Sequence, residues 1–472
     1  MIWTPVSDAP QPAAGEATGQ RTVGAGATVV TASQLVTAGA LGLTGVVIAR
    51  VLGDADTGSF NVVLSALVLL AIPSSLGIEL GASYRVSGRR WAPAEALRQL
   101  QLAALVLGAA GAVVGMGLGV LFSGTAFQLV PTGTLAVGLM ALPFVLSWTY
   151  ASYVALAAER FEAYGAAAAG QSAAALVLVA VLAPPFGLTG AVVALAASHA
   201  LTGAGMLLWG ARALGPASPG WARRARPHLR AAAGFGIRAS LNNALQQLNY
   251  RGDLFLLNAV AASAVVGHYA IALTLTTFAL LLPRALSAVV LPRMSALDAI
   301  AGRAEQERVI VKSVRHAVLL AVVASAVLAL GLLLVPAVYG SDFTPAVGYG
   351  YILIPGMALL GIGSVLASIV VGKGHTRFSL WSALLVTPPT LLLYALLVPA
   401  LEGTGAALAS TISYSAGAIL WWVFFRRATG LRGVARFLPR TEELADYRAL
   451  ASRGRLRLAR RRAAARSKST SR

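Results

Sequence analysis

The sequence contains no cysteine, so it can form no disulfide and offers no thiolate for catalysis or for binding zinc. Charged residues make up only 11% of the chain, whereas a soluble globular protein carries about 25%. The five histidines are scattered, and no phosphate-binding loop of the form Gly-x-x-x-x-Gly-Lys-Ser/Thr occurs. We therefore expect no metal site and no nucleotide cofactor, and we do not expect an enzyme.

Apolar residues fill the chain instead, at 57% of its length and with a mean hydropathy of +0.75. They fall in runs long enough to cross a hydrocarbon core about 30 Å thick as helices. Each run is apolar throughout rather than alternating, which favours helices over the strands of a barrel. We predict an all-α integral membrane protein with about twelve spanning helices, near residues 23–49, 59–83, 99–122, 134–158, 166–185, 189–211, 238–261, 268–292, 316–338, 347–371, 379–400 and 405–425.

The basic residues favour one orientation of these helices. Arg and Lys recur in every second connection, including Arg89, Arg160 and Arg223. The alternate connections hold Arg50 beside Asp54 and otherwise nothing basic. Because cytoplasmic connections are enriched in Arg and Lys, we expect a multi-pass protein of the cytoplasmic membrane with both termini in the cytoplasm.

A weak internal repeat divides the chain into two halves. Residues 48–60 end in Gly-Ser-Phe and residues 257–269 end in Gly-His-Tyr, each at the predicted first external turn of a half. Parallel repeats of this kind are common in transporters. We predict a cytoplasmic leader at 1–22, six-helix bundles at 23–211 and 238–425 with a cytoplasmic linker at 212–237 between them, and a basic cytoplasmic tail at 426–472.

The tail carries fifteen Lys and Arg residues against three acidic ones. Such a segment is attracted to the anionic cytoplasmic leaflet, so we expect anionic membrane lipids to bind it. A tail that only fixes the topology is the simpler alternative. No nucleic-acid-binding fold and no interleaved aromatic residues accompany the charge, and we predict no nucleic-acid partner.

The seventh predicted span is the most polar of the set. Its polar residues form two neighbouring helical stripes, Asn243, Gln247 and Arg251 on one and Asn242, Gln246, Asn249 and Asp253 on the other. A charge near the bilayer centre costs about 3 kcal/mol or more, so this face requires water or a polar ligand. Hydrogen bonds between helices are the alternative, but they explain one or two amides better than a whole polar face.

Three further polar residues lie in predicted spans. Arg284 follows a proline, whose kink can aim the planar guanidinium at the same cavity; an ion pair with Asp253 or Glu79 is the alternative. Glu79 is the clear spanning carboxylate of the first half. Gln34 matches Asn243 under the repeat, so the two amides are expected to face one cavity.

Five segments carry recognisable motifs. They are ARVLGDADTGSF at 49–60 and GIELGASYR at 77–85, then NYRGDLFLL at 249–257, VGHYAIA at 266–272 and LPRALSAVVLPRMS at 282–295. In these segments and in its twelve-span layout, the chain resembles the polysaccharide-transporter family of the multidrug/oligosaccharidyl-lipid/polysaccharide exporter superfamily.

This resemblance implies two six-helix bundles around a central cavity. It also implies a flippase that moves a polyprenyl-pyrophosphate-linked oligosaccharide to the outer leaflet by alternating access, for cell-surface polysaccharide assembly. A polysaccharide polymerase or glycosyltransferases of the same pathway are the implied partners. The cavity residues that the resemblance implies are Arg251, Asp253 and Arg284, with Asn243, Gln247 and Tyr250 available to sugar hydroxyls. The thin positive lining departs from that of lipid-linked peptidoglycan precursor flippases, which argues against a peptidoglycan role.

Other functions stay open from the sequence. A cation-coupled multidrug exporter of the same fold is the nearest, although the first predicted span lacks the carboxylate expected for ion coupling. A membrane glycosyltransferase could use Asp54 and Asp56 to bind a metal and a sugar phosphate, but the external connections are too short for an acceptor site. A structural scaffold gives no reason for the polar seventh span.

Overall fold

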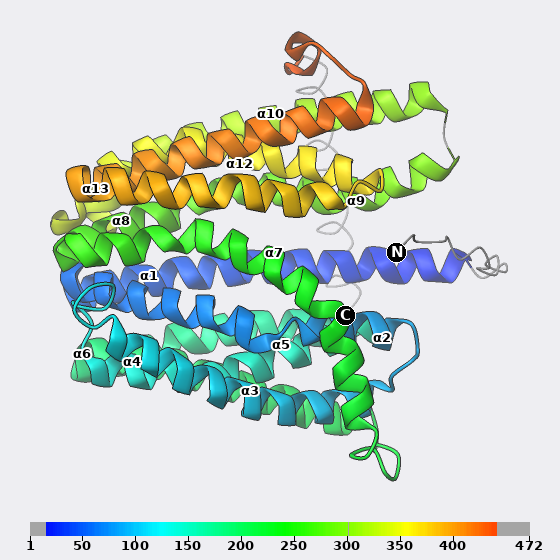
Figure 1. The fold of residues 1–472 in the computed structure, drawn as a ribbon, viewed down its shortest axis with the longest axis horizontal. Helices are drawn as coiled ribbons and strands as arrows, with labels where there is room; N and C mark the ends of the chain where they lie inside the picture. The colour runs from blue at the N-terminus through cyan, green and yellow to red at the C-terminus, as the bar shows by residue number, and fades with distance from the viewer. Residues whose placement is uncertain (1–15, 301, 441–472) are drawn as a thin grey trace, which may run out of the picture. The chain divides into compact units, whose positions relative to one another are not determined.

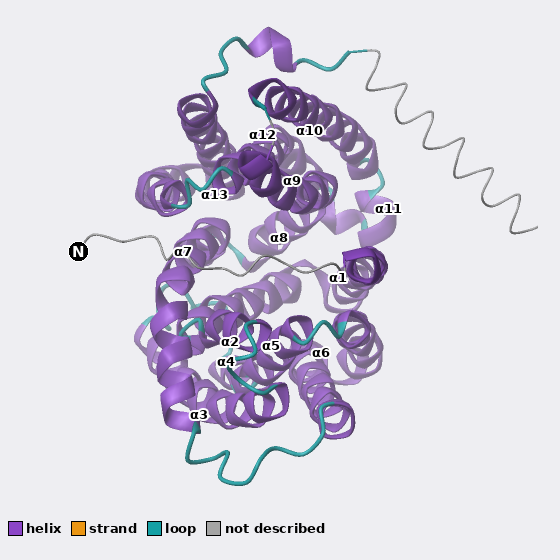
Figure 2. Cartoon of the chain, turned by 90° about the vertical axis from the view of Figure 1, so that its right-hand side faces the viewer, coloured by secondary structure: helices purple, strands orange, loops and turns teal. Residues whose placement is uncertain are grey.

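The computed structural model describes residues 16–300 and 302–440, which form helices joined by short connections (Figures 1 and 2). No strand occurs in these two stretches, which confirms the all-α prediction. The helices are α1 (Glu16–Ser75), α2 (Ile78–Ser87), α3 (Pro93–Leu121), α4 (Thr132–Leu139), α5 (Leu142–Ala157), α6 (Phe161–Ala213), α7 (Ala225–Val260), α8 (Ser263–Thr277), η1 (Phe278–Leu280), α9 (Leu281–Ile300), α10 (Arg303–Leu332), α11 (Val335–Tyr339), η2 (Ser341–Phe343), α12 (Pro345–Gly372), α13 (Arg377–Thr429) and η3 (Val434–Phe437).

The helices account for the twelve predicted spans. Eight of the helical stretches in the described residues are long and apolar enough to cross a membrane. Three of these eight belong to α1, α6 and α13, which break at Gly53, Gly187 and Glu402, so each provides two predicted spans. The more polar α7 provides the seventh span. Helix α1 begins at Glu16, inside the predicted leader, while residues 1–15 of that leader and 441–472 of the tail lie outside the described stretches.

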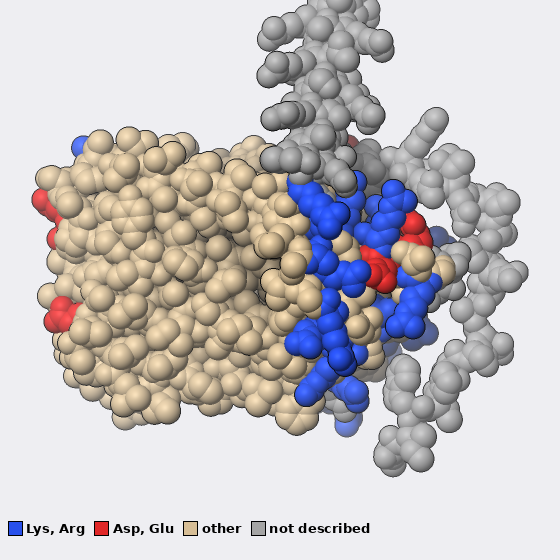
Figure 3. All heavy atoms as spheres, turned by 90° about the horizontal axis from the view of Figure 1, so that it is seen from above, with Lys and Arg blue, Asp and Glu red and all other residues tan. Residues whose placement is uncertain are grey.

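Charged side chains are unevenly distributed over the surface of the protein. On the face drawn in Figure 3, most Lys and Arg gather at one end with some acidic side chains among them, and the few charged side chains at the other end are mainly acidic. The middle of that face carries no charged side chain. Because a charge in the hydrocarbon core is costly, an uncharged middle and charged ends are typical of a multi-pass membrane protein.

The chain forms two compact units, one of residues 1–247 with 262–267 and one of 248–261 with 268–472. Helices α7 and α8 each begin in the first unit and end in the second. The core of the first unit includes the buried Trp91 and Tyr150. That of the second includes Met294 and Phe425.

The described start of the basic tail returns to the second unit. Phe437 of η3 is buried against Trp422 and Phe425, with ring centroids 5.3 and 5.7 Å away. Arg315 Nε donates to the carbonyl oxygen of Arg436 at 2.9 Å. The Arg436 guanidinium also pairs with Glu307 at 2.6 Å, but both of these side chains are more than a third exposed. Residues 434–437 are therefore held by one aromatic side chain and by polar contacts at the surface.

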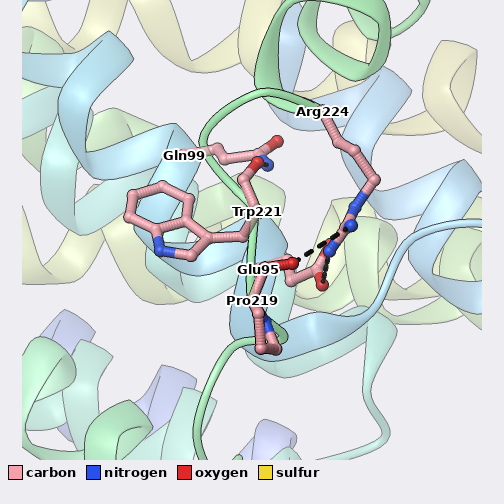
Figure 4. A network of polar contacts seen from close by, with 5 residues as sticks. All are labelled: Glu95, Gln99, Pro219, Trp221 and Arg224. Carbon is pink, nitrogen blue, oxygen red and sulfur yellow. Dashed lines mark hydrogen bonds and ion pairs between the residues drawn. The ribbon is translucent and has the colours of Figure 1, made fainter.

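The proline-containing connection between α6 and α7 is held by polar contacts within the first unit (Figure 4). Arg224 Nη2 lies 2.8 Å from Glu95 Oε1 in the first turn of α3, and Arg224 Nη1 donates to the Pro219 carbonyl at 3.3 Å. Gln99 Nε2 donates to the Trp221 carbonyl at 2.7 Å. The Glu95 side chain is only 7% exposed, so this ion pair is shielded on one side. These contacts fix the chain where α7 begins.

We expect Glu95→Gln to destabilise the first unit by about 1–2 kcal/mol, because it removes the charge-assisted hydrogen bond that the shielded Glu95 carboxylate accepts from Arg224. The matched control is Glu307→Gln, which breaks the exposed pair with Arg436. That pair should contribute little, since exposed ion pairs are worth about 0–1 kcal/mol. Thermal unfolding of the two purified variants in detergent measures the difference, and an equal fall in melting temperature would contradict the assignment.

Candidate functional site

The polar residues of α7 differ in how accessible they are. Asn243 and Gln246 are exposed, while Asn242 and Gln247 are half-buried. In the part of α7 that belongs to the second unit, Tyr250 and Arg251 are half-buried and Asn249 and Asp253 are buried. The polar face that the sequence predicts is therefore exposed near Asn243 and Gln246 and buried near Asn249 and Asp253.

Asp253 is the buried centre of a hydrogen-bonded cluster in the second unit, with 0% of its surface exposed. The Tyr269 hydroxyl of α8 donates to Asp253 Oδ2 at 2.5 Å. The backbone N–H of Leu254 donates to Oδ1 at 2.8 Å, and Ser410 Oγ of α13 lies 3.5 Å from Oδ2. The carboxyl group is thus held by donors from three helices.

A second layer of the cluster is centred on Asn249, one helical turn from Asp253. Asn249 Nδ2 donates to Thr390 Oγ1 at 2.9 Å and to Ser413 Oγ at 3.3 Å. The Tyr394 hydroxyl donates to the Asn249 carbonyl oxygen at 3.2 Å. Because Thr390 and Ser413 lie on opposite sides of the break at Glu402, the cluster ties both halves of α13 to α7.

The predicted basic residues lie around this cluster. Arg251 is within electrostatic range of Asp253 and of Tyr414. The Tyr250 ring meets the Tyr414 ring edge-on at 5.8 Å, and Tyr250 is within electrostatic range of Arg284 on α9. The Arg284 side chain is exposed. The second unit therefore gathers Tyr250, Arg251, Asp253 and Arg284 into one region.

The predicted residues of the first unit do not form one cluster with each other. Gln34 is exposed on α1. Glu79 is buried on α2, where its nearest polar partner is Ser75. Their assignment to a substrate cavity stays a prediction.

The hydroxyl groups that complete the Asp253 cluster were not predicted from the sequence; they belong to Tyr269, Thr390, Tyr394, Ser410 and Ser413. Hydroxyl residues do not stand out in a spanning helix, because they usually bond to the preceding turn of their own helix. The available signal was Asp253 itself, because a buried carboxylate needs several donors and can draw them from neighbouring helices.

The chemistry of the cluster suits a proton or a small cation. It presents one carboxyl group and several hydroxyl oxygens in a site without exposed surface, and such intramembrane carboxyl groups commonly mark ion or proton pathways. No group of three or more His, Cys, Asp or Glu residues suited to a metal ion occurs among the described residues.

Comparison with known proteins shows the fold. No family model matches the sequence, and no curated protein matches it. The structure is similar to the lipid II flippase MurJ in an inward closed conformation, with a TM-score of 0.71 and 12% identity over 87% of this chain and 89% of that one. It is also similar to an inward-facing multidrug resistance MATE family transporter of the MOP superfamily, with a TM-score of 0.66 and 15% identity over 83% of this chain and 94% of that one. A third similar structure is a MOP superfamily transporter from Pyrococcus furiosus, with a TM-score of 0.59 and 15% identity over 86% of this chain and 95% of that one.

These likenesses confirm the predicted fold, and the chain covers nearly the whole of each neighbour. At such identities they show the fold and not the substrate.

We expect Tyr269→Phe to destabilise the second unit by about 1–3 kcal/mol, because a buried carboxyl group loses its nearest side-chain donor. Combining it with Asp253→Asn should cost less than the sum of the two single changes, since both remove the same interaction. The matched control is Tyr351→Phe, whose exposed hydroxyl donates to the Ala329 carbonyl at 3.0 Å. Thermal unfolding in detergent provides the measurement, and strict additivity would contradict the cluster.

Proposed function

We propose that this protein is a flippase that moves a polyprenyl-pyrophosphate-linked oligosaccharide across the cytoplasmic membrane by alternating access. The observation that carries the proposal is α7, whose amides, tyrosine and guanidinium are set in an otherwise apolar helical protein with a transporter fold. A polar helix of this kind is costly in lipid unless it serves a polar ligand or water. An amphiphile with a large polar head fits that requirement.

The residues of the second unit suit the pyrophosphate. Arg251 and Arg284 supply planar guanidinium groups, which bind phosphate oxygens through paired hydrogen bonds. Arg284 is exposed on α9 and lies within electrostatic range of Tyr250, so a ligand could meet both side chains. Asp253 is buried beside Arg251 and is assigned a role in holding the local geometry rather than in touching the anionic head.

The amides suit the sugar. Asn242, Asn243, Gln246 and Gln247 each offer both a donor and an acceptor, the combination that sugar hydroxyls require. Asn243 and Gln246 are exposed, and Gln34 on α1 is exposed as well. We assign these residues to the part of the substrate path that receives the glycan. Glu79 is buried and is not assigned to glycan binding.

The charge pattern supports an orientation in the membrane. We assign both termini to the cytoplasm because Lys and Arg are concentrated in the connections expected on that side. The basic tail is assigned to the anionic cytoplasmic leaflet, and a polymerase or glycosyltransferases of the same pathway would supply or consume the lipid-linked glycan.

A cation-coupled multidrug exporter is the second candidate. The fully buried Asp253 favours it, because an ion-coupled transporter needs a carboxyl group that can exchange its ion between states. Drug resistance conferred by the wild-type protein, with no change in surface glycan when its gene is deleted, would select this function.

We expect Arg251→Ala and Arg284→Ala each to insert normally and to reduce the appearance of lipid-linked oligosaccharide in the outer leaflet by at least about tenfold, since a charge-assisted contact is worth about 1.5–3 kcal/mol. The assay follows a defined lipid-linked oligosaccharide in proteoliposomes by its accessibility to an added glycan-modifying enzyme. The matched control is Arg377→Ala, an exposed arginine beside Phe378 at the start of α13.

Normal flipping by both the Arg251 and Arg284 variants would overturn the site assignment. An absence of flipping by the wild-type protein with any lipid-linked oligosaccharide would overturn the proposed function itself.

A further inference from the structure

The backbones of α2 and α7 are in direct contact in the first unit. A Cβ added to Gly77 would overlap the backbone of Gly236, and one added to Gly81 would overlap the backbone of Ala232. Gly81 of α2 and Gly77 just before α2 are four residues apart, as are Ala232 and Gly236 of α7, so small residues meet at two successive contacts. Small residues with this spacing allow spanning helices to pack closely. We call this contact the α2–α7 seam.

The helix is interrupted at one end of the seam. Helix α1 ends at Ser75 and α2 begins at Ile78, while Leu76 and Gly77 adopt φ angles of 52° and 65°. The left-handed region costs a leucine about 1–2 kcal/mol, and such strain is often found at sites that change conformation. The interruption lies inside one predicted span, where unpaired backbone groups must find partners within the protein.

Glu79 lies two residues beyond the interruption and is 91% buried, its exposed fraction being 9%. Its Oε1 is 3.3 Å from Ser75 Oγ, while its Oε2 is buried and has no hydrogen-bond partner. Among the described residues, no Lys or Arg forms an ion pair with it. A carboxylate held in this way would have only its own backbone N–H and the distant Ser75 hydroxyl as donors, and burying an ionised carboxylate without a charged partner is strongly unfavourable.

The single proton of the Ser75 hydroxyl has two acceptors within reach. Ser75 Oγ lies 2.9 Å from the Ile72 carbonyl oxygen and 3.3 Å from Glu79 Oε1, and it accepts the Gly77 N–H at 3.2 Å. A serine hydroxyl has one proton and two acceptor lone pairs. When that proton is directed at the nearer Ile72 oxygen, a protonated Glu79 can donate to Ser75, whereas an ionised Glu79 receives no hydrogen bond from it.

The titratable and charged groups around Glu79 do not supply a partner that would stabilise its ionised form. Tyr150 and Tyr153 of α5 lie within electrostatic range of it. The Tyr150 hydroxyl donates to the Ser75 carbonyl oxygen at 3.0 Å and is therefore already used. Arg85 on α2 contacts His228 of α7 at 3.0 Å, and Glu95 on α3 is paired with Arg224.

We propose that Glu79 is a proton-binding site of the first unit, and that its proton keeps the α2–α7 seam closed. Loss of the proton would leave a charge beside the strained Leu76–Gly77 turn, and opening the seam would give that charge access to water. Because α7 also carries the polar face, protonation of Glu79 would control the position of the helix that we assign to substrate binding. The inference goes beyond the proposed function, since it holds for a lipid-linked sugar or a drug.

Infrared spectroscopy of the purified full-length protein tests the proton. We expect a carboxylic acid carbonyl band at neutral pH that disappears in Glu79→Gln and persists in Asp253→Asn. Glutamine has the shape of the protonated acid, so the variant should fold. An infrared spectrum in which Glu79→Gln removes no acid band at neutral pH overturns the proposal.

Cross-linking tests the seam without any transport assay. The Tyr84 and Phe235 rings stack across it with centroids 5.0 Å apart, and the chain has no native cysteine. We expect the pair Tyr84→Cys and Phe235→Cys to form a disulfide several-fold less readily at alkaline than at neutral pH, relative to the same pair in Glu79→Gln. Equal pH dependence in the two backgrounds overturns the control of the seam. Neither experiment depends on the cargo, so failure of the flippase assay would leave both results interpretable.

Discussion

In a lipid solvent a polar group can bond only to the chain itself or to water admitted by the fold, and the structure depends on this constraint. Asp253 shows the consequence most clearly. Its carboxyl group is fully buried and takes donors from α7, α8 and α13, so one ionisable side chain determines where three helices meet. Glu95 at the start of α3 pairs with Arg224 and so fixes the connection that leads into α7.

Helix α7 combines two kinds of surface along its length. In the first unit it packs through Ala232 and Gly236, where small residues let two backbones touch. In the second unit it packs through Asn249 and Asp253, where hydrogen bonds replace close apolar contact. Between these two segments lie the amides that we assign to the substrate. A helix that belongs to both units and carries the polar face is well suited to link substrate binding to conformational change.

Much of the fold could be predicted from hydropathy, because the solvent imposes it. The breaks at Gly53, Gly187 and Glu402 fall between predicted spans, where short polar or glycine-containing turns interrupt the apolar runs. The interruption at Leu76 could not be predicted, since it lies inside an apolar run and is stabilised by contacts with residues far away in the sequence.

The candidate site was predictable only in part. Arg251 and Asp253 stand out in the sequence because charge is rare in a spanning helix. The hydroxyls of Tyr269 and Ser410 do not stand out, because each is distant from Asp253 along the chain and contacts it only in the folded protein. The contact between Arg224 and Glu95 was hidden for the same reason, as both residues resemble ordinary cytoplasmic charges.

The central claim is that the polar face of α7 lines the path of the substrate, and the absence of native cysteine allows a direct test. Asn243→Cys and Gln247→Cys place a thiol on the polar face, and Leu241→Cys places one on an exposed apolar position of the same helix. We predict that a water-soluble, membrane-impermeant thiol reagent labels the first two in intact membranes and leaves the third unlabelled. Lipid-linked oligosaccharide should slow that labelling. Equal labelling at all three positions, or labelling at Leu241→Cys alone, would contradict the account.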